Sequence, residues 1–465
     1  MGMGTLPLLA LQMTSVGKSL KGLQTQATSD KPNILILVFD TLSAPHTSLQ
    51  GYKRDTTPNL SRFAEQANVY QQHYAGGNFT SAGTASLLTG TYPWTHRALQ
   101  LHSTVLDDLA EHNLFQAFDD GYYKIAYSHN LLVTSLLDQF RKGIDQFKKT
   151  RELCLSDLQY SDRVFPNDYH VAFHGEWENL RGGGKGYPSS LALSFADRAN
   201  RFIVKRLLDR QYGNSFPRGV PSLHSLHFIL EDVIDWLIAD LASLPQPFLA
   251  YVHVLPPHEP YSTRREFVDA FKGDGVEPVS KPEHFASEDQ DRASLVRLSR
   301  MYDEYMIYAD AEFGRLYDNL EQKNLLDNLM MLVTSDHGQL FERGIHGHVT
   351  PAIYEPVIRV PLLIKQPGQS SKQEFNTPTS CVDVLPTLLA ASGQGIPEWC
   401  EGRVLPGFQS DLVNQASGAV FTVEAKSNPK LAPLNKATVG MVQDKYKLIH
   451  NRVTKKQEKR MNYTI

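Results

Sequence analysis

Carboxylate and imidazole side chains lie at the ends of three short apolar runs of the chain. Asp40 follows the first run, the second contains His253 and is followed by His258, and Asp336 and His337 follow the third. If these runs are neighbouring parallel strands, their carboxyl ends meet at the edge of the sheet where ligands bind in open α/β folds. Carboxylate oxygens combined with imidazole nitrogens suit a divalent cation. The pattern therefore predicts a metal centre at this edge, although each aspartate taken alone is equally typical of a helix cap.

A stretch of small hydroxyl-bearing residues supplies a candidate nucleophile. Residues 78–90 read Asn-Phe-Thr-Ser-Ala-Gly-Thr-Ala-Ser-Leu-Leu-Thr-Gly, which predicts a short helix that begins near Thr80 and is closed by Gly90. The free backbone N–H groups and the positive dipole of such an N-terminus would stabilise a phosphate, a sulfate or a tetrahedral oxyanion. A neighbouring cation would lower the pKa of the Thr80 hydroxyl and make it a usable nucleophile. Taken alone, Thr80 or Ser81 is typical of a helix N-cap.

The three apolar runs are typical of strands that are buried on both faces of a parallel sheet. They cover residues 34–39, 248–254 and 329–333, and they are too short and too uniformly apolar for surface helices. Apolar residues at helical spacing predict an amphipathic helix at residues 229–241, before the second run, and another at residues 305–316, between the second and third runs. Strands separated by helices predict an α/β fold, with a mostly parallel sheet between two layers of helices.

Length and charge allow a large globular enzyme and exclude several other classes of protein. The chain has 465 residues, and its 46 Lys and Arg against 50 Asp and Glu give a formal net charge of −4, without a basic surface for nucleic acid. No apolar run approaches the roughly 18 residues that a transmembrane helix needs. No Lys or Arg precedes the brief apolar stretch at residues 6–11, so we predict a cytoplasmic rather than an exported protein.

Composition divides the chain into three parts. Residues 1–30 end in a stretch rich in Ser, Thr, Gln and Gly, which predicts a disordered lead-in. Residues 31–370 contain the apolar runs and the polar residues that follow them, and they form the predicted catalytic domain. Residues 371–465 combine a short helical stretch with strand-like pieces, which predicts a smaller α+β subdomain. Residues 156–225 carry no recognisable motif, so the natural substrate stays open.

Segments distributed in order along the chain resemble the sulfatase branch of the alkaline phosphatase superfamily. They correspond to its opening strand and first metal aspartate, its Gly-Tyr and Thr-Pro-Asn-Leu signature, its nucleophile helix, its Pro-His-x-Pro-Tyr strand end, its second metal pair and the segments after that pair. The matching segments are residues 32–42, 51–64, 80–93, 257–261, 335–338, 344–348, 354–362 and 382–389. Each motif alone is weak, whereas their shared order is specific. The resemblance implies a mostly parallel sheet between helices, with a smaller C-terminal subdomain.

The resemblance also implies a metal site. Carried over residue by residue, it gives Asp40, Asp336 and His337 as ligands of one divalent ion, with the hydroxyl of Thr80 completing the coordination. A second metal is not expected, because relatives often have Asp at the position of Pro256. The ligand set would accept Ca²⁺, Mg²⁺, Mn²⁺ or Zn²⁺.

The same comparison implies catalytic roles around this metal. Thr80 would attack phosphorus or sulfur in line and form a covalent ester, which water later cleaves. His258 would bind the substrate oxyanion or protonate the leaving group, and His346 or His348 would do the same from the other side.

Two departures from the common sulfatase pattern change the expected chemistry. Sulfatases carry Cys or Ser within a C/S-x-P-x-R motif and convert it to formylglycine, whereas here Thr80, Ala82 and Thr84 occupy the nucleophile, Pro and Arg positions. Threonine cannot become formylglycine, because its methyl group would leave a ketone rather than an aldehyde. No formylglycine is therefore expected, and the missing Arg removes a charge that would neutralise a bound anion. Relatives with Thr at this position resemble phosphodiesterases and phosphoethanolamine or phosphoglycerol transferases.

The resemblance thus implies a metal-dependent hydrolase that forms a covalent intermediate on Thr80, with a phosphoester favoured over a sulfate ester. One alternative is a phospho-head-group transferase that uses the same site, although such enzymes usually carry membrane helices. Another is a degenerate protein that keeps the fold and the metal without turnover. The expected partner is a small-molecule, carbohydrate or lipid-head-group ester rather than a nucleic acid, and the oligomeric state stays open.

Overall fold

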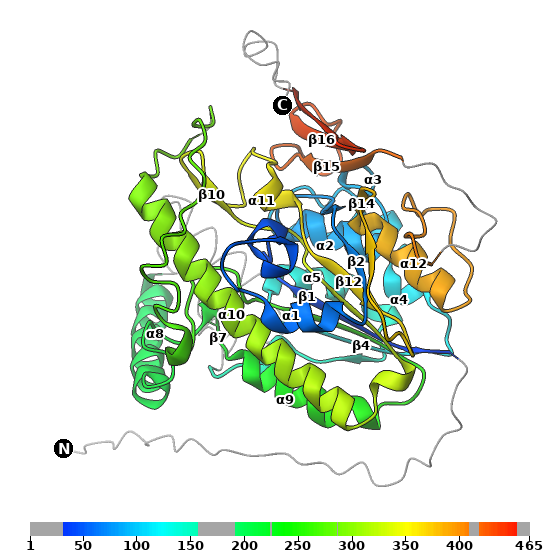
Figure 1. The fold of residues 1–465 in the computed structure, drawn as a ribbon, viewed down its shortest axis with the longest axis horizontal. Coiled ribbons are helices and arrows are strands. Elements are labelled where there is room, and N and C mark those ends of the chain that lie inside the picture. Colours follow the sequence, from blue (N-terminus) through cyan, green and yellow to red (C-terminus); the bar gives the residue numbers. More distant parts are fainter. Residues whose placement is uncertain (1–30, 157–190, 224–225, 286, 409–417, 453–465) are drawn as a thin grey trace.

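An eight-stranded sheet runs through the middle of the molecule, with helices on both of its faces (Figure 1). The computed structural model describes residues 31–156, 191–223, 226–285, 287–408 and 418–452. In their order across the sheet, the strands are β13 (Gln373–Phe375), β2 (Asn68–Tyr70), β12 (Leu362–Lys365), β9 (Leu329–Thr334), β1 (Asn33–Phe39), β8 (Phe248–Val254), β4 (Tyr123–Ser128) and β5 (Gln146–Phe147). Only β12 runs antiparallel to its neighbours, β9 and β2. The predicted α/β class with a mostly parallel sheet is confirmed.

The three apolar runs form the three adjacent strands β9, β1 and β8 at the centre of the sheet. Every residue of these strands is buried. Their register places Leu37 of β1 opposite Val252 of β8 on one side and Val333 of β9 on the other. Burial on both faces explains why the runs are continuously apolar instead of alternating with polar residues.

Alternate residues of β1 pack into two separate cores, one on each face of the sheet. The odd-numbered residues from Leu35 to Phe39 join the core beneath one helical layer, and the even-numbered residues from Ile34 to Val38 join the core beneath the other. The first layer consists of α1 (Pro58–Ala64), α9 (Leu230–Asp240) and α10 (Arg292–Gln322), and the second of α2 (Thr80–Thr89), α4 (Leu114–Ala117), α5 (Leu131–Gln139) and α12 (Val384–Ala391). The sheet is therefore held between two apolar layers that fix the positions of its strand ends.

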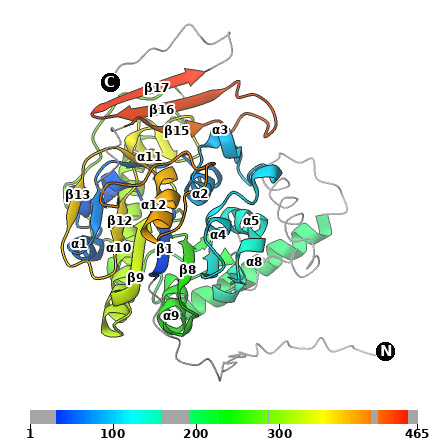
Figure 2. The same ribbon diagram turned by 90° about the vertical axis from the view of Figure 1, so that its right-hand side faces the viewer.

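A separate three-stranded antiparallel sheet lies along the top of Figure 2. It consists of β15 (Val420–Glu424), β16 (Ala437–Gln443) and β17 (Tyr446–Arg452). The chain before it belongs to the main body, because β13 pairs with β2 and α12 packs in the core of the second helical layer.

Short elements complete the described part of the chain. They are α3 (Pro93–His96), α11 (Glu355–Ile358), the hairpin β10 (Leu340–Glu342) and β11 (Ile345–Gly347), the hairpin β6 (Ser222–Leu223) and β7 (Leu226–His227), and the pair β3 (His73–Tyr74) and β14 (Thr379–Ser380). The motif-free region continues as α8 (Leu191–Tyr212), whereas its residues 157–190, like the predicted lead-in at residues 1–30, lie outside the described residues. No helix among the described residues is long and apolar enough to cross a membrane.

Candidate active site

Five polar side chains meet at the carboxyl ends of the adjacent strands β9, β1, β8 and β4. Asp40 follows β1 directly, Asp336 and His337 lie just beyond β9, His253 is the penultimate residue of β8, and Asn130 lies just beyond β4. All five are buried. The sheet order alone brings them together, since parallel neighbours end at the same edge.

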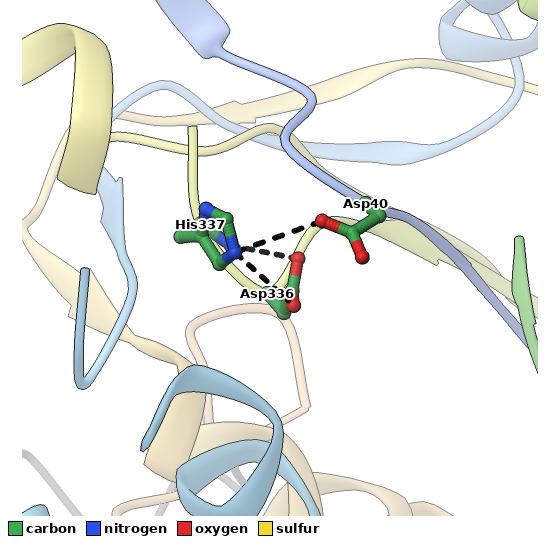
Figure 3. Close-up of side chains that lie close together, drawn as sticks. All are labelled: Asp40, Asp336 and His337. Atoms are coloured by element: carbon green, nitrogen blue, oxygen red, sulfur yellow. Dashed lines mark hydrogen bonds and ion pairs between the residues drawn. The ribbon is translucent and has the colours of Figure 1, made fainter. Parts of the chain in front are cut away.

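Asp40, Asp336 and His337 form a compact group of ligand atoms (Figure 3). His337 Nε2 lies 3.6 Å from Asp40 Oδ1 and 3.6 Å from Asp336 Oδ2. His337 Nδ1 donates to the carbonyl oxygen of Gly338 at 3.0 Å, which leaves the lone pair of Nε2 facing the two carboxylates. Asp40 Oδ1 is buried without a hydrogen-bond partner. These atoms, which lie within 4.8 Å of one another, fit a divalent cation that would satisfy the orphaned oxygen.

The charges of Asp40 and Asp336 also favour binding of a cation beside them. Burial and the negative charge of Asp40 raise the pKa of Asp336 to about 8. Burial would raise the pKa of Asp40 as well, but the positive charge of His258 holds it below its usual range. Burial lowers the pKa of His337 to about 4, so this imidazole is neutral at physiological pH. Two carboxylates this close cannot both ionise inside a protein unless a positive charge lies between them.

Metal affinity should therefore rise with pH. Without a cation, Asp336 keeps its proton until the pH approaches its raised pKa of about 8. A cation must displace that proton, so we expect Mn²⁺ affinity to increase about tenfold per pH unit between about pH 6 and pH 8 and to level off above. Isothermal titration calorimetry in buffers of different ionisation enthalpy would measure both the affinity and the released proton. An affinity that is constant over this range would contradict the expected displacement.

Thr80 is the first residue of α2 and points its hydroxyl at the metal-ligand group. Its Oγ1 lies 3.2 Å from His337 Nε2 and is within hydrogen-bond distance as a donor. The first turn of α2 comes this close to β9 because residue 83 is glycine, where a Cβ atom would collide with the carbonyl oxygen of Asp336. The helix ends at Thr89, before Gly90, whose φ of 67° is the left-handed conformation typical of a helix C-terminus. The structure thus places the hydroxyl of Thr80, the free N–H groups of a helix N-terminus and the carboxylates in one site.

Asn130 connects this hydroxyl to the carboxylates, and the sequence analysis did not identify it. Its Nδ2 donates to Asp40 Oδ2 at 2.6 Å and lies 3.5 Å from Thr80 Oγ1. Its Oδ1 accepts from the backbone N–H of Leu132 at 2.9 Å and so caps α5, which fixes the orientation of the amide. The helix cap therefore aims an N–H group at the oxygen that we expect to react.

Two of the predicted catalytic histidines lie beside the metal-ligand group. The ring of His348 is centred 4.3 Å from that of His337 and 5.1 Å from that of His258. His348 Nδ1 donates to Gln339 Oε1 at 2.7 Å, so its Nε2 is a hydrogen-bond acceptor. Burial holds the pKa of His348 well below its usual range, which favours a neutral base or acceptor. His258 is partly exposed, so it is better placed to exchange protons with a leaving group.

His346 occupies a different environment from His348. Its Nε2 lies 2.9 Å from the hydroxyl of Tyr261 and 3.2 Å from Glu259 Oε2. Gln339 Nε2 donates to the same Tyr261 hydroxyl at 2.8 Å. His346 is thus connected to His348 through a chain of hydrogen bonds that runs through Tyr261 and Gln339.

Comparisons with known proteins identify a family and several relatives of this chain. A family model described as Sulfatase matches residues 32–394. An arylsulfatase of Clostridium perfringens is 22% identical over 417 residues, which cover 83% of this chain and 79% of the relative. A choline-sulfatase of Rhizobium meliloti is 25% identical over 411 residues, which cover 81% of this chain and 71% of the relative.

Solved structures show the same fold. The phosphonate monoester hydrolase SpPMH of Silicibacter pomeroyi superposes with a TM-score of 0.64 at 18% identity, covering 91% of this chain and 88% of that one. A phosphonate monoester hydrolase of Agrobacterium radiobacter gives a TM-score of 0.59 at 18% identity, with the same coverage.

Proposed function

The chain belongs to the sulfatase family of ester hydrolases within the alkaline phosphatase superfamily, and from this premise we propose that it cleaves phosphoric esters in preference to sulfate esters, with Thr80 as its covalent nucleophile. The position of Thr80 supports the proposal most strongly. Its hydroxyl lies at a helix N-terminus, 3.2 Å from a nitrogen that faces two buried carboxylates. A residue there is suited to attack an anionic centre.

Each part of the site has a role in such a reaction. A divalent cation held by Asp40, Asp336 and His337 would supply Lewis acidity, which lowers the pKa of a nearby hydroxyl and neutralises developing negative charge. The N–H groups in the first turn of α2 bind the oxyanion of the ester. Thr80, as its alkoxide, forms a bond to phosphorus while the bond from phosphorus to the ester oxygen breaks.

The remaining residues complete the cycle. His258 donates a proton to the departing alcohol, which leaves His258 ready to accept a proton from water. That water attacks phosphorus, breaks the bond to Thr80 and releases phosphate. Asn130 directs an N–H group at the Thr80 oxygen throughout, and this favours the charged over the protonated form of the nucleophile.

The preference for phosphorus rests on the identity of the nucleophile. Thr80 cannot form the aldehyde hydrate through which sulfatases with formylglycine release sulfate. One relative is named choline-sulfatase, and one similar solved structure is named phosphonate monoester hydrolase. We propose a small-molecule, carbohydrate or lipid-head-group ester as the substrate of this chain.

A paired hydrolysis assay tests the proposal directly. The purified protein would be supplied with each of Ca²⁺, Mg²⁺, Mn²⁺ and Zn²⁺ and offered p-nitrophenyl phosphate, bis-p-nitrophenyl phosphate and p-nitrophenyl sulfate. We expect turnover of at least one phosphorus ester at more than about ten times the kcat/KM for the sulfate. A preference for the sulfate would show that an unmodified threonine serves sulfuryl transfer and would overturn the proposed specificity.

A further inference from the structure

A second imidazole also faces the two carboxylates. His253 is wholly buried in β8, and its Nε2 has no hydrogen-bond partner. This atom lies 3.4 Å from Asp40 Oδ2 and 3.9 Å from Asp336 Oδ2. Its other nitrogen, Nδ1, lies 3.1 Å from the hydroxyl oxygen of Tyr251. An N–H group at Nδ1 can donate a hydrogen bond to that oxygen, and in this tautomer the lone pair of Nε2 is free.

The two oxygens of Asp40 are divided between the two imidazoles. Oδ1 faces His337 at 3.6 Å, whereas Oδ2 faces His253 at 3.4 Å. Asp336 Oδ2 is shared, at 3.6 Å from the first imidazole and 3.9 Å from the second. Carboxylates that present oxygens to two nitrogen donors are typical of two-metal hydrolytic sites, in which the ions lie about 3.5–4 Å apart. The hydrogen bond from Asn130 leaves Asp40 Oδ2 a second lone pair for such an ion.

We propose that Asp40 Oδ2, Asp336 Oδ2 and His253 Nε2 hold a second divalent cation. Thr84 offers one more oxygen, since its Oγ1 lies 3.4 Å from Asp336 Oδ2. The imidazole nitrogen favours Mn²⁺ or Zn²⁺ over Ca²⁺ at this position. This inference rests on the proposed function, because the second site shares both aspartates with the metal site of that function.

Charge balance in the site supports this second cation. Thr84 stands at the position where the common sulfatase motif has Arg, so that positive charge is missing. Among the described residues, no Lys or Arg forms an ion pair with Asp40 or Asp336. One divalent ion balances the two carboxylates, which leaves the Thr80 alkoxide and the substrate anion without compensation. A second ion beside Thr84 would restore the missing positive charge.

Metal stoichiometry tests the second site without depending on activity. The protein would be stripped of metal, saturated with Mn²⁺, freed of excess ion by gel filtration and analysed by mass spectrometry of the metal. We expect two Mn²⁺ per chain in the wild type and one in His253→Asn. His73→Asn is the matched control, because His73 is another wholly buried imidazole whose Nε2 lacks a partner, but it bonds to Thr379 rather than to the carboxylates. This control should keep two ions.

Electron paramagnetic resonance of the wild type gives an independent result that needs no variant. Two Mn²⁺ ions sharing carboxylates should show an exchange-coupled spectrum, and His253→Asn should show the spectrum of a single ion. A wild type that saturates at one Mn²⁺ with a single-ion spectrum, or a His253→Asn variant that keeps a coupled pair, would overturn the second site. Phosphoester hydrolysis by a one-metal enzyme would leave the proposed function intact, whereas two bound ions without any hydrolysis would reject that function and retain the second site.

Discussion

Replacement of Thr80 by alanine is expected to lower kcat for the best phosphorus ester by at least about three orders of magnitude. The substitution removes the oxygen that forms the covalent ester, while the neighbouring carboxylates and the helix N-terminus remain. Thr80→Ser keeps the hydroxyl and should retain activity to within about tenfold. Steady-state kinetics would measure both variants. Acid quenching during turnover followed by intact-mass measurement should detect one added phosphoryl group in the wild type and in Thr80→Ser, but none in Thr80→Ala.

The control for this experiment lies at the other end of the same helix. Thr89 is also buried, but its hydroxyl donates to the carbonyl oxygen of Ala85 at 2.7 Å, away from the carboxylates. Thr89→Ala should therefore keep nearly full activity. Near wild-type turnover by Thr80→Ala would reject Thr80 as the nucleophile. Peptide mapping of the trapped ester would then examine Ser81, the adjacent hydroxyl, which is buried without a partner.

The central strands were predictable from sequence because both of their faces are buried. β4 was not recognised, since its sequence contains a charged residue, Lys124, at its second position. The structure accommodates this lysine by directing its Nζ to the carbonyl oxygen of Phe118 at 2.7 Å. The antiparallel direction of β12 was equally hidden, because a strand's sequence reports its burial and not its direction. The connection after β9 contains a short hairpin and one turn of helix instead of a crossover helix.

The site was predictable to the extent that its residues come directly after recognised strands. Asp40 and Asp336 belong to this group, and their grouping with His337 follows from the sheet order. Asn130 was missed because it follows the unrecognised strand β4. The sequence placed His253 near the end of an apolar run. Its proposed role as a metal ligand depends on the unpartnered Nε2, which only the three-dimensional structure shows.

Asp336→Asn is expected to abolish hydrolysis and yet to stabilise the metal-free protein. Activity should fall by at least about three orders of magnitude, because the substitution removes one of the two charges that hold the cation. In EDTA, where no metal is bound, the same substitution should instead increase the stability of the protein. The pKa of Asp336 rises from 3.8 in the unfolded chain to about 8 in the fold, so this carboxyl costs the wild type stability progressively as the pH rises through that range. Asparagine never carries the charge and avoids this cost.

Thermal unfolding in EDTA should therefore show a higher Tm for Asp336→Asn than for the wild type at pH 7, by about 1 °C for each kcal/mol gained in a chain of 465 residues. The difference should shrink towards pH 5. Saturating Mn²⁺ should reverse the order, since an ion that binds only the folded state stabilises the wild type by mass action.

Asp310→Asn separates this effect from the general consequence of neutralising a buried aspartate. Burial raises the pKa of Asp310 to about 6, but its carboxylate accepts the backbone N–H groups of Asn59 and Leu60, each at 2.8 Å, at the start of α1. Asparagine replaces one of these two acceptor oxygens with an NH2 donor, which should lower Tm in EDTA, while Mn²⁺ should still raise it. If Asp336→Asn also lowers Tm in EDTA at pH 7, the two carboxylates do not repel each other in the metal-free fold. A cation would then have to be held by geometry alone rather than by the relief of that repulsion.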